Sequence, residues 1–97
     1  MRNIKLADGT VYHVDRCGAD NGTLAINIIE HQDIWELVDK FSVEENVSTI
    51  EHYFDGTETD HVFFRGYIYL VAAALTFTGV TVTLRNQPYP VPNAPNE

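Results

Sequence analysis

The chain has 97 residues, about the size of one domain, and 44% of them are hydrophobic, too many for a disordered polypeptide. Fourteen acidic residues against six basic residues give a formal charge of −8 at pH 7. Nucleic-acid phosphates and anionic membranes would repel this charge, so the expected partner is a basic protein surface, with no direct nucleic-acid or membrane binding.

The expected compartment is the cytoplasm. The first residues are polar and form no apolar signal-peptide core. The most apolar run, residues 67–75, is shorter than the roughly 20 residues that a membrane-spanning helix needs. The lone cysteine, Cys17, forms no internal disulfide and suits a reducing compartment.

The first thirty residues predict three antiparallel strands in meander order. Apolar Ile4 and Leu6 alternate with polar neighbours, and the Asp-Gly pair at 8–9 predicts a two-residue hairpin turn. An extended segment follows at 11–14. The Asn-Gly pair at 21–22 predicts a second turn of the same chemistry before a strand over 23–29.

A helix is predicted over residues 33–41, because apolar side chains at 34, 37, 38 and 41 follow helical spacing. Asp33 and Glu36 fit an N-terminal capping arrangement, and Lys40 lies in the last turn, where a cation complements the helix dipole. Residues 42–46 read as an exit turn.

The second half predicts strands at 47–54, 61–64 and 80–84, with Val80, Val82 and Leu84 facing inward. Residues 55–60 form a polar turn, and Gly66 marks an expected bulge. Residues 67–77 fit either a strand or a short helix, and their β-branched neighbours favour the strand.

Together these elements predict one α+β domain over residues 1–85. An antiparallel sheet of about five or six strands, in the order ββ-β-α-β-β-β, is packed by one amphipathic helix. Residues 86–97 hold all four prolines and predict an extended or disordered tail. The expected state is a monomer or a small homo-oligomer.

The negative charge is concentrated in one third of the chain. Residues 30–60 contain ten acidic residues and one lysine, a charge of −9, while the rest contains five basic and four acidic residues, a charge of +1. The acidic residues are interpreted either as a solubilising face or as a partner-binding surface that imitates the charge of nucleic acid. They are Glu30, Asp33, Glu36, Asp39, Glu44, Glu45, Glu51, Asp55, Glu58 and Asp60.

Two groups of residues suggest structural zinc. If Phe54 pairs with His61, then His52 and His61 are diagonal neighbours with Asp60 beside them, although a slip of one residue separates the histidines. His13 and Cys17 share one face of a regular strand, about 13 Å apart, too far for one ion unless the chain folds back.

No catalytic motif is present, so the protein is not expected to be an enzyme. Paired carboxylates carry little information in so acidic a chain, and Cys17 beside Arg16 has no local Cys-His signature. The aromatic residues are expected to pack in the core and on the sheet faces. They include Trp35, Tyr53, Phe63, Phe64, Tyr67 and Tyr69.

Four short motifs resemble small proteins of phages and prophages from Gram-positive bacteria. They are Asp-Gly-Thr-x-Tyr-x-Val at 8–14, Asn-Gly-Thr-Leu-x-Ile-x-Ile at 21–28, Phe-x-Gly-Tyr at 64–67 and Val-Thr-Val-Thr-Leu at 80–84. Size, acidity and a single cytosolic domain also resemble the type II-A anti-CRISPR proteins that such phages carry. That class shares no common residue motif, so the resemblance assigns no individual residue.

The resemblance implies a non-catalytic inhibitor that covers a basic nucleic-acid-binding surface of a CRISPR effector nuclease in the infected host. Some proteins of that class bind zinc. The alternative is an accessory module of the phage virion, in the tail or baseplate. A small zinc-dependent enzyme is a further alternative.

Overall fold

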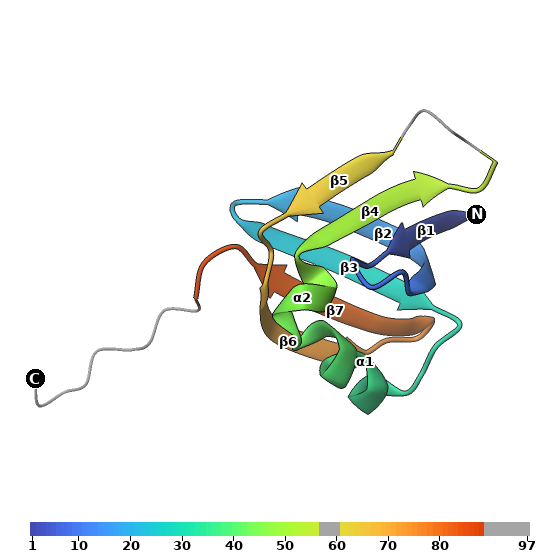
Figure 1. Ribbon diagram of the computed structural model, residues 1–97. Coiled ribbons are helices and arrows are strands. Elements are labelled where there is room, and N and C mark those ends of the chain that lie inside the picture. The colour runs from blue at the N-terminus through green and yellow to red at the C-terminus, as the bar shows by residue number, and fades with distance from the viewer. Residues whose placement is uncertain (57–60, 89–97) are drawn as a thin grey trace, which may run out of the picture.

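The computed structural model describes residues 1–56 and 61–88, which form one antiparallel sheet of seven strands and two short helices (Figure 1). The strand order across the sheet is β5-β4-β1-β2-β3-β7-β6. The elements are β1 (Arg2–Lys5), β2 (Val11–Asp20), β3 (Thr23–Ile29), α1 (Ile34–Phe41), α2 (Glu44–Val47), β4 (Thr49–Phe54), β5 (Val62–Arg65), β6 (Tyr69–Leu75) and β7 (Gly79–Arg85).

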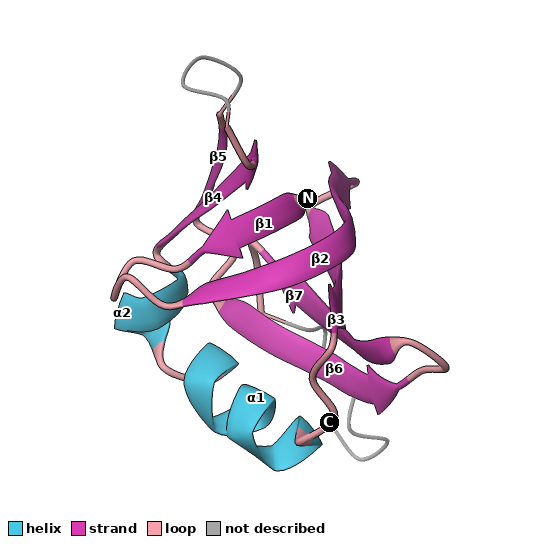
Figure 2. Cartoon of the chain, turned by 90° about the vertical axis from the view of Figure 1, so that its right-hand side faces the viewer, coloured by secondary structure: helices cyan, strands magenta, loops and turns pink. Residues whose placement is uncertain are grey.

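The sheet curves around a single hydrophobic core, with the two helices beside its open side (Figure 2). Alternating side chains of β3 and β7 supply the centre of this core, and each is fully buried. Helix α1 packs chiefly against β6 and α2 and contributes Leu37 and Phe41 to the core. The core thus joins both halves of the sheet to the helices.

The predicted α+β fold with five or six strands and one packing helix is therefore wrong. The structure is mostly β-sheet, with helices of only eight and four residues. Residues 67–77, for which the sequence allowed either a strand or a short helix, contain the strand β6. The predicted exit turn at 42–46 contains the start of α2. Pairing with β7 makes β6 a strand, and side-chain periodicity alone carries no information about that pairing.

The meander of the first three strands is confirmed. Asn21 and Gly22 both have positive φ angles, 53° and 74°, as a two-residue hairpin turn of this type requires. The first turn is one residue longer than predicted: the Leu6 N–H donates to the Thr10 carbonyl oxygen at 2.8 Å, with Gly9 at a φ of 92°.

A β-bulge interrupts β2 between Val14 and Arg16, where the pairing with β3 shifts by one residue. Val14 pairs with Ile28, and Cys17 pairs with Ile26. The extra residue reverses the usual alternation of faces, so both Val14 and Cys17 pack toward the core. The bulge expected at Gly66 is wrong, since this residue lies in the connection between β5 and β6 with a φ of 87°.

The predicted helix and its N-terminal cap are both confirmed. Asp33 precedes α1, and its side chain accepts a hydrogen bond from the Glu36 backbone N–H at 3.1 Å. The predicted domain boundary falls at the end of β7, where the Asn86 N–H still donates to the Gly22 carbonyl oxygen at 3.0 Å. Residues 89–97 of the predicted tail lie outside the described residues. Within the described ranges, no helix is long and apolar enough to cross a membrane.

At Gly79, β7 leaves no room for a side chain beside the backbone of β3. A Cβ atom at this position would lie 1.8 Å from the Ile28 carbonyl oxygen, which is backbone and cannot rotate away. Gly18, in the exposed part of β2, has nothing within 4 Å of the corresponding Cβ position. A side chain therefore fits at position 18 and does not fit at position 79.

We predict that Gly79→Ala lowers the free energy of unfolding by about 1–3 kcal/mol or more, because the strands must separate to admit the methyl group. The matched variant Gly18→Ala should be neutral or slightly stabilising, by up to ~1 kcal/mol, since its methyl group meets open space. Urea unfolding of both variants measures the difference. Equal stability of the two variants would contradict this account of the β3–β7 contact.

Candidate functional site

An acidic groove of about 580 Å³ runs along the exposed side of α1. Three of its residues are acidic and one is basic, so its formal charge is −2. The residues that line it are Asp33, Trp35, Glu36, Asp39, Lys40 and Asn46.

Helix α1 is fixed to the β1–β2 turn by polar contacts at its C-terminal half. The Lys40 ammonium donates to an Asp8 carboxylate oxygen at 2.8 Å. Asn46 connects the two helices to the same turn, because its side chain donates to the Lys40 carbonyl oxygen and its own carbonyl accepts from the Ala7 N–H, both at 2.9 Å. The floor of the acidic groove is therefore held in place.

The buried face of the same helix packs on Tyr12 of β2, which is 8% exposed. The Tyr12 ring stacks on Phe41 with 6.0 Å between ring centroids and meets the edge of His31 at 5.5 Å. Burial is the main cause that raises the pKa of Tyr12, and the nearby Glu36 carboxylate adds to it. Tyr12 thus stays a neutral packing residue under the acidic groove.

Trp35 is the feature of the acidic groove that the sequence did not reveal. The sequence predicts packing in the core or on a sheet face for the aromatic residues, Trp35 included, but 73% of the Trp35 surface is exposed. The inward face of α1 is completed by Leu37 and Phe41, so the Trp35 ring is left on the solvent side, where it lines the acidic groove together with Asp33 and Asp39. Phe63 and Tyr69, also expected in packing positions, are 47% and 38% exposed.

The acidic third of the chain does not form one continuous surface. Glu30, which has a φ of 60°, lies before the helices. Its side chain is exposed, and so are those of the α1 acids and of Glu44 and Glu45 in α2. Asp55 lies beyond the far end of β4 from α2, roughly 20 Å away along an extended strand. Glu58 and Asp60 fall outside the described residues.

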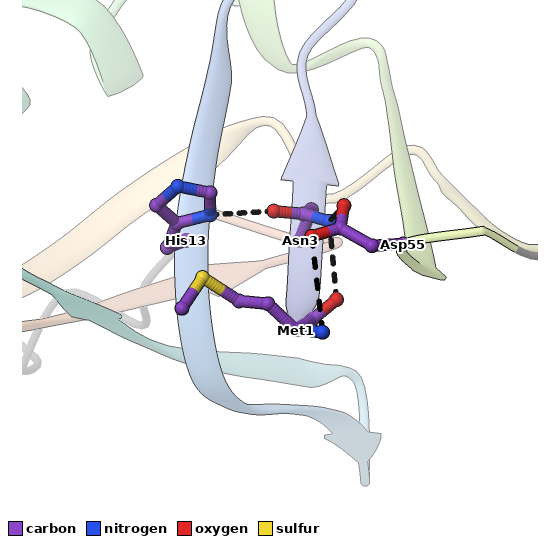
Figure 3. Close-up of polar contacts among 4 residues, drawn as sticks. All are labelled: Met1, Asn3, His13 and Asp55. Carbon is purple, nitrogen blue, oxygen red and sulfur yellow. Dashed lines mark hydrogen bonds and ion pairs between the residues drawn. The ribbon is translucent and has the colours of Figure 1, made fainter.

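The two acids of the β4 region have local partners. Glu51 is hydrogen-bonded to the His61 ring. Asp55 accepts from the Asn3 side-chain amide at 2.5 Å and lies 3.8 Å from the Met1 amine (Figure 3). Asn3 is only 1% exposed, and its side-chain oxygen Oδ1 is 2.6 Å from the His13 Nδ1 atom. Because an amide oxygen can only accept, Nδ1 is the donor in this contact. These contacts connect β1, β2 and the end of β4.

The β4–β5 hairpin does not have the register that the two candidate zinc ligands require. His52 pairs with Val62, one residue away from the register that would make His52 and His61 neighbours. His61 stacks on Tyr53 at 5.2 Å, whereas His52 meets Phe54 at 6.0 Å on the other face. Desolvation lowers the pKa of His52, with a smaller contribution from Arg2. A one-residue slip places the two rings on opposite sides of the sheet.

The second candidate pair is separated by the β2 bulge. His13 faces Asn3 on the outer side of the sheet, whereas Cys17 packs against the core opposite Ile26. Burial raises the pKa of the Cys17 thiol to about 12. Across residues 1–56 and 61–88, no group of three or more histidine, cysteine, aspartate or glutamate side chains is placed to hold a metal ion.

Comparison with known proteins does not identify a family, because the chain matches no protein-family model, no curated protein and no solved structure. The functional argument therefore depends on the acidic groove itself.

The ion pair between Asp8 and Lys40 gives a pH-dependent prediction. The hydrogen bond from Lys40, followed by that from the Thr10 backbone N–H, lowers the Asp8 pKa from 3.8 to about 2. The carboxylate therefore stabilises the folded protein above pH 3.8, and this contribution is lost as the pH falls through about 2. Asp8→Asn should lower the urea midpoint at pH 7, and the difference from the parent protein should disappear near pH 2.

Asp20→Asn is the matched control, because it removes the same charge from an exposed position of β2. Its urea midpoint should stay close to that of the parent protein at both pH values. An Asp8→Asn midpoint equal to that of Asp20→Asn at pH 7 would show that the ion pair does not hold α1 in place.

Proposed function

We propose that the protein is a non-catalytic inhibitor that places its acidic groove on a basic nucleic-acid-binding surface of a type II CRISPR effector nuclease. Binding there would block engagement of DNA. The observation that carries this proposal is the exposed Trp35, which lines one groove with three carboxylates, on a helix fixed by the Asp8–Lys40 ion pair. The site of action is the cytoplasm of an infected bacterium.

The charge of the acidic groove supports a basic partner. Glu36 and Asp39 lie on one short helix and Asp33 caps its start, as acidic groups would on a surface that replaces a phosphate backbone. Lys40 adds little positive charge toward a partner, since Asp8 already pairs with it. Complementary charge of this kind speeds association and weakens as salt screens it, over a distance of about 8 Å at physiological ionic strength.

Trp35 supplies the apolar part of the contact. Tryptophan is enriched among the residues that dominate protein–protein binding energy, and its ring face also attracts arginine and lysine side chains. An arginine of the partner can therefore stack on Trp35 while its guanidinium bonds the flanking carboxylates. A purely solubilising surface would require the charges but not the exposed indole.

The test is competition for DNA on a guide-loaded type II-A effector nuclease, measured by polarisation of a labelled target duplex. The parent protein should displace the duplex, with an affinity that falls as salt rises. Asp39→Lys and Trp35→Ala should each weaken inhibition about tenfold or more, because they remove one carboxylate contact and the stacking surface.

Asp20→Lys is the matched control for Asp39→Lys, since both reverse one exposed acidic residue and change the net charge equally. Inhibition by Asp20→Lys should stay within about twofold of the parent protein. If Asp39→Lys inhibits as well as Asp20→Lys, net charge rather than the acidic groove is responsible. Absence of displacement by the parent protein at low salt rejects the proposed function.

A further inference from the structure

A second surface feature lies on the outer side of the sheet, where β2, β3 and the β6–β7 turn meet. It is a hollow of about 330 Å³ beside the β2 bulge, referred to here as the sheet hollow. Its charged residues are one acid and one base, so its own formal charge is zero, in contrast to the acidic groove. Six of its lining residues are Asp15, Arg16, Asn27, Phe77, Thr78 and Thr81.

Asn27 organises the polar side of the sheet hollow. Its amide nitrogen donates to an Asp15 carboxylate oxygen at 2.6 Å and to the Thr78 hydroxyl at 3.1 Å. Its carbonyl oxygen accepts from the hydroxyls of Thr81 at 3.0 Å and Thr76 at 3.3 Å. All four hydrogen-bonding positions of the side chain are used, which fixes the hydroxyl and carboxylate groups around it.

Phe77 forms the apolar side and is fully exposed, at 102% of its reference surface. The turn that carries it is closed by the Thr76 N–H, which donates to the Gly79 carbonyl oxygen at 2.8 Å, and by the Gly79 N–H on the Thr76 hydroxyl at 3.1 Å. Two other exposed phenylalanines differ, because guanidinium groups lie about 5 Å above Phe54 and Phe63. Phe77 thus presents a bare ring on a fixed turn.

The charged, polar and aromatic side chains that line the sheet hollow fit some classes of ligand better than others. An anion such as a nucleotide would meet one cation, Arg16, on a protein of charge −8. A hydrocarbon would remove water from the Asp15 carboxylate and the threonine hydroxyls, whose hydrogen-bonding capacity Asn27 fills only in part. A cation would meet Asp15 and Arg16 together, and because their charges cancel the sheet hollow offers it no net attraction. A neutral ligand with many hydroxyl groups and one apolar face satisfies all of these groups.

The geometry points to a saccharide-binding site in the sheet hollow, with one neutral pyranose ring stacked on Phe77. The C–H groups on one face of the sugar would contact the aromatic face, whose partial charge is negative. Its hydroxyls would donate to Asp15 and accept from Arg16 and the Thr78 hydroxyl. The volume is at the lower end of the range for small-molecule sites, which fits one sugar ring. This inference does not depend on the proposed function.

The test is a titration of the ¹⁵N-labelled full chain, followed by NMR, with glucose, galactose, N-acetylglucosamine and maltose up to 50 mM. Saturable shifts of the Asn27 side-chain amide and of the backbone amides of Thr78 and Gly79 are expected for at least one sugar. The midpoint should be on the order of 1 mM, as expected for so small a ligand. No saturable shift with any of the four sugars overturns the inference.

Two competing probes test the ligand class on the same resonances. Adenosine monophosphate represents anionic ligands, and n-butylguanidinium represents a basic side chain. Both should bind at least tenfold more weakly than the best sugar. Tighter binding of either probe overturns the assignment to a neutral saccharide.

Variants of exposed residues test the stacking contact without risk to the core. Phe77→Ala should weaken sugar binding about tenfold or more, and Phe77→Tyr should retain it, because the tyrosine keeps an aromatic face. Trp35→Ala is the control, since it removes an exposed aromatic ring from the acidic groove and should leave sugar binding unchanged. Equal affinity of Phe77→Ala and the parent protein contradicts the stacked geometry.

Discussion

The direct pairing of β3 with β7 is the constraint on which the rest of the structure depends. Leu24, Ile26 and Ile28 lie opposite Leu84, Val82 and Val80, and all six side chains are fully buried. A slip of either strand by one residue would turn its own apolar row toward solvent, so burial and register specify each other. The close approach at Gly79 extends this pairing to the end of β3 and places the Thr76–Gly79 turn beside Asn27.

The β2 bulge determines which side chains of β2 lie on each face of the sheet. Before the bulge, His13 faces outward to the buried Asn3; after it, Cys17 faces the core. The residue at the bulge, Asp15, remains on the outside, where Asn27 holds it in the sheet hollow. One inserted residue therefore removes a candidate metal pair and creates a polar wall. A regular strand would have kept His13 and Cys17 on one face.

Local chemistry was sufficient to predict the elements that depend on neighbouring residues. The Asn21–Gly22 turn, the Asp33 cap and the inward row of β7 follow from residues only a few positions apart. The register of the 54–61 hairpin, the exposure of Trp35 and the sheet hollow depend on contacts between distant segments. Asn27 illustrates the difference, because its partners are 12 to 54 residues away and no local pattern marks them. The threonines on either side of Phe77 and the glycine that follows indicate a turn, but they do not indicate that the phenylalanine ring is exposed.

The uneven charge of the chain has a structural consequence for both surfaces. Residues 30–60 carry −9, but Asn3 engages Asp55 and His61 engages Glu51, so among the described residues of this segment the other exposed acids lie on or beside the helices. The sheet hollow draws its charges from Asp15 and Arg16, outside that third, and they cancel. The Glu30 N–H joins the two regions by donating to the Thr78 carbonyl oxygen at 3.4 Å. An exposed acidic residue is thereby kept near the sheet hollow, where it disfavours anions and has no effect on a neutral ligand. The same charge distribution that directs the acidic groove to a basic protein thus disfavours anionic ligands at the sheet hollow.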